Sequence, residues 1–351
     1  MTEAHHQDGE FVAFLSFEMH SCPDGDYTVL YQGSRGDILQ SQGLADLHAR
    51  LRALNSQGIS AIAFPHHIAY RRGQRGINWT TFDEAFSPVV EIVSMHGCSE
   101  ADEGPRPFLH VMGPSDHMST MRYGLSRGHF FGVIGSTDHH SAHPGSYGHG
   151  RTGLWARVKT RVAIWEALLT RRTFALTGDC IELQFAINDY PMGTKIASAK
   201  ARQIALRVVG GAPIDYVDVV KNGGLMRRFS RCDVPKSISS NVIRTKLCLE
   251  VGWGERRMRT DWEVKFGISE GCILAVEPRF RGPEVVALTD EQLLGHSDSL
   301  RASPSGHRRS HWEPDGPRAV RFWATTCGNP NNVTPATQGI CLDVDAGRGR
   351  S

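Results

Sequence analysis

The stretch Phe131-Gly132-Val133-Ile134-Gly135-Ser136-Thr137-Asp138-His139-His140 decides how this chain is interpreted. Its short apolar run ends in an Asp-x-His pair, so the carboxylate of Asp138 and the imidazole of His140 would follow directly from a strand. A strand end is rigid and holds such groups in place better than a mobile loop does. Histidines also gather around it, because ten of the 17 lie between His66 and His149. The pattern predicts a metal site of imidazole and carboxylate groups.

Strand-like and helix-like segments alternate through the first half of the chain. Apolar runs of strand length predict four buried strands, over Phe11–Phe17, Ile59–Phe64, Val89–Val93 and Phe131–Ile134. Helical spacing of apolar residues predicts two helices, over Leu44–Leu54 and Arg161–Arg172. Strand, helix and strand in this order indicate parallel βα units. We therefore expect an α/β domain over residues 1–178, either a barrel or an open sheet.

The sequence pattern changes after Gly178. Short, often alternating apolar segments follow, and glycine, proline and asparagine separate them, as in Lys221-Asn222-Gly223-Gly224. Short apolar segments separated by turn-forming residues are typical of antiparallel β-structure. Residues 179–351 are thus predicted to form a smaller, β-rich domain, with a mobile segment near 298–317 that is rich in Ser, Arg, His and Pro.

Bulk composition excludes several classes of protein. The 351 residues carry a formal charge of +2, which gives no reason to expect nucleic acid or a membrane surface as partner. No apolar run is long enough to span a bilayer, and no secretory signal is recognisable. The eight cysteines are scattered and form no CxxC pair, which is most simply explained by free thiols in a reducing cytoplasm.

Four predicted strands are each followed by residues of the kind that bind metals. In parallel α/β folds the C-terminal ends of the strands meet at one face, where sites form. Each residue has a structural alternative: Glu18 could be a solvated edge residue, and Asp138 could cap a turn. The expected ligands are Glu18, His66, His96, Asp138 and His140.

Imidazole and carboxylate ligands together suit zinc, manganese or iron, and we expect one to three such ions. A bound cation would lower the pKa of water to roughly 7 and make a nucleophile available at neutral pH. Guanidinium groups match phosphate geometry, so Arg75 and Arg151, with His67, are predicted to hold a small anionic substrate. Asp138, His140 and Arg151 are the expected catalytic residues.

Taken together, these residues resemble the PHP (polymerase and histidinol phosphatase) superfamily of metal-dependent phosphoesterases. The resemblance covers roughly residues 9–225. It is carried by Phe17-Glu18, Pro65-His66-His67, Glu91–Glu100, Gly135–His140 and Arg171–Gly178. It implies a distorted (β/α)7 barrel, two or three metal ions at the C-terminal strand face, and hydrolysis of a phosphorylated substrate. It also implies that Glu18 bridges metals, that His66 and His96 are ligands, and that Asp138 with His140 closes the site.

The chain departs from this family before Glu18. The family begins with a His-x-His motif and a Thr-Asp-His motif, and neither occurs here. We therefore expect an incomplete barrel that begins inside the domain, with unpaired strand edges that favour homo-oligomers. Two alternatives stay open: a catalytically inactive metal- or ligand-binding remnant, and an amidohydrolase-like enzyme that cleaves a C–N bond.

Overall fold

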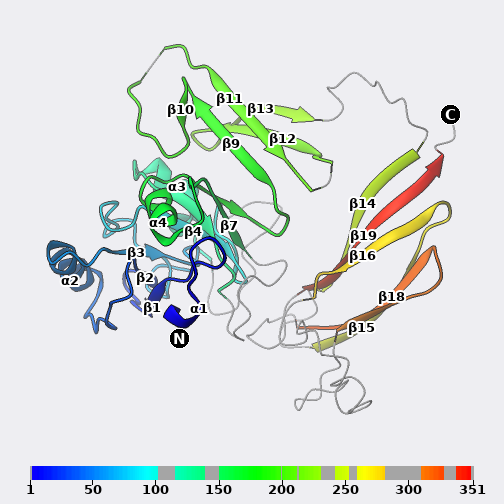
Figure 1. The fold of residues 1–351 in the computed structure, drawn as a ribbon, viewed down its shortest axis with the longest axis horizontal. Coiled ribbons are helices and arrows are strands. Elements are labelled where there is room, and N and C mark those ends of the chain that lie inside the picture. Colours follow the sequence, from blue (N-terminus) through cyan, green and yellow to red (C-terminus); the bar gives the residue numbers. More distant parts are fainter. Residues whose placement is uncertain are drawn as a thin grey trace. The chain divides into compact units, whose positions relative to one another are not determined.

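The computed structural model divides the chain into two compact units. It describes residues 2–101, 115–138, 150–198, 200–211, 213–230, 242–252, 259–280, 310–327 and 337–348. The first unit comprises residues 1–138, 149–210 and 221–224, and the second is formed chiefly by residues 211–220 and 225–351. Residues 179–210, which the sequence placed in the β-rich second part, thus belong to the first unit. Figure 1 shows the fold of each unit.

The first unit begins with an antiparallel meander of β1 (Leu15–Met19), β2 (Tyr27–Tyr31) and β3 (Ala61–Pro65). Every second side chain of β2, namely Tyr27, Val29 and Tyr31, is fully buried, as expected for a strand with one covered face. The helix α2 (Leu44–Ser56) covers this face with Leu44, Leu47 and Leu51. Its core positions follow the predicted helical spacing.

A second, mixed sheet contains β4 (Val89–Ser94), β5 (Gly97–Cys98) and β6 (Gly132–Gly135). β4 is buried along its whole length and pairs parallel with β6. Beside β6 lies the hairpin of β7 (Arg151–Leu154) and β8 (Thr173–Leu176), whose connection contains α4 (Arg161–Leu169). Leu30 and Phe64, on the face of the first sheet away from α2, pack with Val89 and Leu168. The two sheets and α4 therefore share one core.

Smaller elements complete the first unit. They are α1 (Thr2–His5), the 3-10 turn η1 (His117–Ser119), α3 (Met121–Ser126), β9 (Glu182–Ile187), β10 (Tyr190–Pro191) and β11 (Ile204–Val209). The order β10-β9-β11 makes a third, antiparallel sheet. None of the helices in the described ranges has the length and apolar character needed to cross a bilayer.

The second unit is built from two antiparallel sheets. One has the order β14-β19-β16 and the other β15-β18-β17. The strands are β14 (Val242–Gly252), β15 (Arg259–Gly267), β16 (Cys272–Pro278), β17 (His311–Pro314), β18 (Ala319–Cys327) and β19 (Thr337–Arg348). Side chains from both sheets, including Phe322 and Leu342, form a single apolar core, so this unit is a β-sandwich. A separate ribbon pairs β12 (Tyr216–Lys221) with β13 (Gly224–Ser230).

The predicted (β/α)7-type barrel is wrong. The strands beginning the chain pair antiparallel, and short antiparallel sheets dominate the described residues. The physical reason lies in the connection between β1 and β2. Only residues 20–26 connect these strands. A crossover between parallel strands needs a dozen residues or more. The apolar pattern does not predict β2, and without this strand β1 and β3 are expected to be neighbours in a parallel sheet.

Two smaller predictions are also affected. Cys248 and Cys341 are joined by a disulfide between the paired strands β14 and β19, so the cysteines are not all free thiols and the inference of a reducing compartment loses its basis. Within the segment expected to be mobile, His311–Pro314 forms the ordered strand β17. Residues 298–309 lie outside the described ranges.

Candidate metal centre

Side chains from the C-terminal ends of two strands, β1 and β3, form a compact group of ligand-type atoms. Glu18, His66 and His67 each offer one such atom, and these three atoms lie within 4.8 Å of one another. The distance between His66 Nε2 and Glu18 Oε1 is 3.0 Å. A second group with the same spacing joins Glu18 to His20 and Asp26. Because Glu18 belongs to both groups, its carboxylate is positioned to bridge them.

Asp26 ties the hairpin turn to this cluster. Its carboxylate is buried, with 1% of the side chain exposed, and Oδ2 lies 3.1 Å from His20 Nδ1 and 3.6 Å from His67 Nε2. Oδ1 accepts a hydrogen bond from the backbone N–H of Ser21. Burying a carboxylate is expensive unless it is paired or binds a cation, so the position of Asp26 favours a charged partner at this point.

A second pair of ligand-type groups adjoins the first. His96 Nε2 lies 2.8 Å from Asp138 Oδ2. The ring of His67 connects the two pairs, with centroid distances of 4.2 Å to His66 and 5.0 Å to His96. The structure therefore brings together Glu18, His66, His96 and Asp138, four of the five predicted ligands. The fifth, His140, lies outside the described residues.

The carboxylate of Glu91 holds the backbone next to the cluster through two hydrogen bonds. It is 2% exposed, and it accepts hydrogen bonds from the backbone N–H of His67, at 3.0 Å, and from the hydroxyl of Ser136. These bonds tie the loop after β3 and the end of β6 to the centre of β4. Glu91 thus fixes the positions from which His67 and Asp138 project.

The backbone is strained at the residues of this cluster. His67 has a φ of 36° and Asp138 a φ of 47°, and both lie in the left-handed region that non-glycine residues rarely adopt. Arg75, with a φ of 74°, shares this feature, and its Nη1 lies 3.5 Å from Asp26 Oδ2. Strain of this kind persists where the surroundings impose it, and it concentrates at functional sites.

The pKa values of two histidines in the cluster are shifted in opposite directions. Burial lowers the pKa of His66, but the hydrogen bond with Glu18 and the charges of two further carboxylates outweigh it and raise the pKa to about 9. Burial and the neighbouring imidazoles lower the pKa of His67 to about 2, so His67 is neutral. A neutral imidazole has a free lone pair, which is the form that binds a metal.

The two buried acids are also shifted in opposite directions. Burial raises the pKa of Glu91 to about 7. Burial acts in the same sense on Asp138, but its hydrogen bond and charge interaction with His96 prevail and hold the pKa well below its ordinary value. Titratable groups whose environments push their pKa values apart are typical of functional sites.

Buried polar atoms without a hydrogen-bond partner test whether a cation fits here. In the described part of the chain, Asp26 Oδ2, His66 Nδ1 and His67 Nδ1 are buried and have no hydrogen-bond partner. Such atoms are rare in native proteins because each carries a desolvation penalty. Carboxylate oxygens and imidazole nitrogens in one cluster are a donor set for zinc, manganese or iron, so the residues fit such an ion.

The two arginines predicted to bind substrate lie in different surroundings. Arg75 reaches the cluster through Asp26. Arg151 begins β7, and its Nη1 lies 3.6 Å from Cys180 Sγ. Its backbone lies beside Gly135. His67, predicted to bind substrate, lies within the group of possible ligands.

Sequence reasoning missed Asp26 and Glu91. Glu91 carried a usable signal, since a lone acid inside the apolar run Val89–Val93 is costly unless it has partners. Asp26 carried none, because its role depends on the unpredicted hairpin between β1 and β2.

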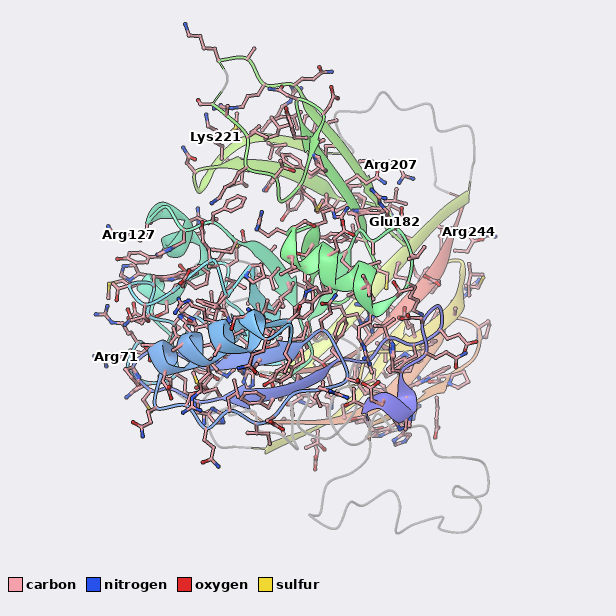
Figure 2. The ribbon with its side chains drawn as sticks, turned by 60° about the vertical axis from the view of Figure 1, so that its left-hand side comes forward. Arg71, Arg127, Glu182, Arg207, Lys221 and Arg244 are labelled. Atoms are coloured by element: carbon pink, nitrogen blue, oxygen red, sulfur yellow. A yellow bond between two sulfur atoms is a disulfide. The ribbon has the colours of Figure 1, made fainter. Side chains whose placement is uncertain are left out.

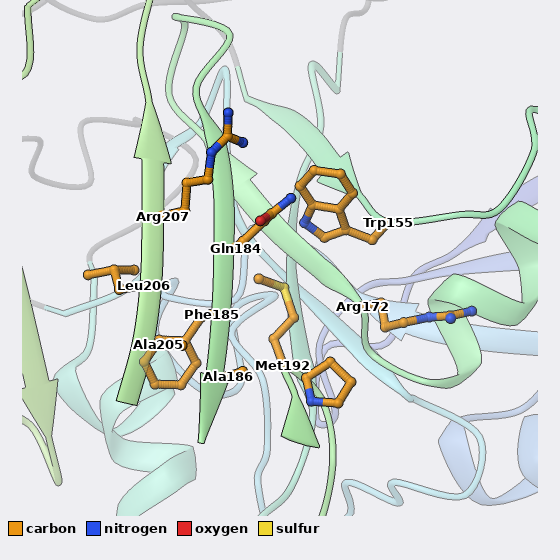
Figure 3. Close-up of a pocket in the computed structure, with 10 residues that line it drawn as sticks. Trp155, Arg172, Gln184, Phe185, Ala186, Met192, Ala205, Leu206 and Arg207 are labelled. Carbon is orange, nitrogen blue, oxygen red and sulfur yellow. The ribbon is translucent and has the colours of Figure 1, made fainter. Parts of the chain in front are cut away.

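A separate apolar pocket of about 370 Å³ opens between β9, β11 and Trp155. In Figure 3 the side chains of Gln184 and Trp155 point toward each other, with Met192 below them. Its lining contains no histidine, cysteine, aspartate or glutamate. It therefore offers no metal ligands, and the candidate chemistry stays with the cluster around Glu18.

The chain is similar to three chlamydial proteins that bear the name uncharacterised protein. It is 29% identical over 171 residues to proteins of Chlamydia muridarum and Chlamydia trachomatis, covering 44% of this chain and 28% of each relative. It is 27% identical over 184 residues to a Chlamydia pneumoniae protein, covering 48% of this chain and 29% of the relative. The chain thus spans less than a third of these curated relatives. No family model and no solved structure matches it.

Proposed function

We propose that this protein is a metal-dependent hydrolase of the PHP type that cleaves a phosphoester at the cluster around Glu18. The observation that carries the proposal is the presence of buried ligand atoms without a hydrogen bond on His66 and His67, next to the buried carboxylate of Asp26. A divalent cation, when bound, supplies Lewis-acid activation of water and of a phosphoryl oxygen. Zinc, manganese and iron suit the donor set.

The protein's own residues have distinct parts in this proposal. Glu18, His66 and His67 hold the cation, and Asp26 supplies a further buried carboxylate. Asp138 orients His96 through their 2.8 Å contact. Arg75 is 40% exposed on its side chain and lies next to Asp26, so its guanidinium can reach both the cluster and an anionic oxygen of a bound substrate.

Metal content is the first test. Elemental analysis of the purified protein should find zinc, manganese or iron at one to three ions per chain. His66→Ala should lose most of that metal, whereas His117→Ala should keep it, because His117 is exposed and lies outside the cluster. Metal below a tenth of an equivalent in the unaltered protein, after incubation with each ion, would support the inactive-remnant alternative instead.

Substrate class is the second test. A panel of phosphomonoesters, phosphodiesters and amides should show hydrolysis of a phosphoester only, and Asp138→Ala should abolish it. Circular dichroism must show that the variant folds. Turnover unchanged in Asp138→Ala would remove the proposed site, and hydrolysis confined to amides would point to the amidohydrolase-like alternative.

A further inference from the structure

A polar pocket of the first unit is lined by residues that do not belong to the metal cluster. It has a volume of about 300 Å³, and none of the cluster residues lines it. Its polar lining comes from the loop before β4 and from the end of α3 and the segment that follows. These residues are Arg72, Asn78, Thr80, Tyr123, Arg127 and His129. Its lining contains no acidic residue.

The two arginines of this pocket have no ion-pair partner within the described ranges. Arg72 and Arg127 are both exposed, and no salt bridge of the described residues includes them. Figure 2 labels Arg127, which lies in the first unit. The pocket therefore carries a formal charge of +2 from its arginines, without compensation from its own lining.

The three acids closest along the sequence are Asp83, Glu84 and Asp116, and each is held by other groups. Asp83 accepts a hydrogen bond from the backbone N–H of Ala85. Asp116 accepts a hydrogen bond from the backbone N–H of Met118 and so caps η1. Glu84 pairs with Lys195 at 2.7 Å and accepts the backbone N–H of Phe130. All three carboxylates thus have other hydrogen-bond partners, and none of them lines the pocket.

Two further groups of the pocket can donate hydrogen bonds. Asn78 Oδ1 already accepts from the backbone N–H and the hydroxyl of Thr80, at 3.2 and 2.7 Å, which leaves the Asn78 amide nitrogen available. Trp79 is 4% exposed, and its Nε1 has no acceptor among the described residues. A wall that offers donors and positive charge is complementary to an oxyanion.

Aromatic packing makes this wall rigid. Trp79 stacks on His129 at 5.3 Å and on Phe131 at 5.2 Å. A Cβ at Gly124 would come within 2.5 Å of the Trp79 ring, so glycine is what allows α3 to approach it. The donors of the pocket therefore stand on a preformed surface, which reduces the entropy lost on binding.

We propose that this pocket binds the phosphate group of a small organic phosphate, at a site distinct from the metal cluster. Two guanidinium groups suit a dianion, and a volume of about 300 Å³ leaves room for a small organic group beyond the phosphate. The inference does not rest on the proposed hydrolysis, because it uses none of the residues of the cluster.

The test is calorimetric titration of the full chain with inorganic phosphate and with phenyl phosphate at constant ionic strength. Arg127→Gln and Arg72→Gln should each weaken phosphate binding about tenfold or more, the loss expected for a charge-assisted hydrogen bond. Arg71→Gln is the matched control: it removes the same charge from an exposed arginine that does not line the pocket, and it should leave the affinity unchanged. Phenyl phosphate should bind more tightly than phosphate.

The cluster itself is the competing site, and His66→Ala separates the two. Phosphate affinity that is unchanged in His66→Ala and reduced in Arg127→Gln supports the pocket. Loss of binding in His66→Ala with full binding in Arg127→Gln would assign the phosphate to the cluster and overturn the inference. Equal weakening in Arg71→Gln and Arg127→Gln, or no saturable binding at all, would overturn it as well.

Discussion

Replacing Glu91 by glutamine should stabilise the metal-free protein above neutral pH. Burial raises the pKa of the Glu91 carboxyl from 4.5 to about 7. Below pH 4.5 the group is protonated in both the folded and the unfolded state. Between pH 4.5 and about 7 the unfolded chain loses this proton while the folded protein keeps it, so the free energy of unfolding falls across this range and stays at its lower value above about pH 7. The interval between the two pKa values corresponds to on the order of 3 kcal/mol, which glutamine would recover.

The hydrogen bonds of Glu91 set the opposing cost. The glutamine oxygen can still accept from His67 N–H, and its amide nitrogen can donate to Ser136 Oγ, so the loss is about 1 kcal/mol. The net expectation is a gain of about 2 kcal/mol at pH 8.5 and a loss of no more than about 1 kcal/mol at pH 4. Urea denaturation in the presence of a chelator, followed by circular dichroism, measures both values.

Glu166→Gln is the control for this experiment. Glu166 is exposed and pairs with Arg172 at 3.0 Å, so its replacement should change the free energy of unfolding by less than about 1 kcal/mol at either pH. A loss of stability in Glu91→Gln at pH 8.5, larger than in the control, would refute the reasoning. It would mean that the cationic His66 stabilises the charged carboxylate more than burial penalises it.

Three further predictions concern other parts of the chain. In metal-free protein the pKa of His66 should be about 9 by NMR titration, and Glu18→Gln should lower it because the hydrogen bond that favours the cation is lost; an unchanged value contradicts the assigned pair. Phe322→Ala, in the core of the β-sandwich, should lower the free energy of unfolding by about 3–5 kcal/mol. Leu274→Ala, at a position that is 48% exposed, should lower it by less than about 1 kcal/mol. Similar losses for the two variants in urea denaturation would refute the assigned core. Under oxidising conditions Cys341→Ser should lower the free energy of unfolding by about 4 kcal/mol, because the disulfide closes a loop of 93 residues. Cys272→Ser, at a free thiol, should not lower it in this way. Equal melting temperatures of Cys341→Ser and the unaltered protein would refute the pairing.

Local sequence pattern predicted individual elements well. The apolar runs at Ile59–Phe64 and Val89–Val93 correspond to β3 and β4, and the leucine spacing after Leu44 corresponds to α2. Strand pairing could not be predicted in the same way, because it depends on contacts between residues distant in sequence. β2 was missed, although Tyr27, Val29 and Tyr31 alternate as a half-buried strand should.

The candidate site, like the fold, could be predicted from the sequence only in part. Glu18, His66 and His96 were found because each follows or ends an apolar run, and that relation is visible in the sequence. The resemblance from which the barrel was inferred does not extend to the strand order. Asp26 precedes β2 and Glu91 lies in β4, and these strands belong to two different sheets. Their roles therefore follow only once the pairing of β1 with β2 and the packing of the two sheets are known.

The hairpin of β1 and β2 makes the length of one short turn as important as the identity of any ligand. Glu18 is paired with Thr28, while Tyr27 and Val29 face the opposite side of the sheet. Insertion or deletion of a single residue between Met19 and Tyr27 would shift this pairing and turn either Glu18 or the tyrosines to the wrong face. Natural variants of this protein should therefore keep the length of this turn together with His20 and Asp26, and exchange the other amino acids of the turn more readily.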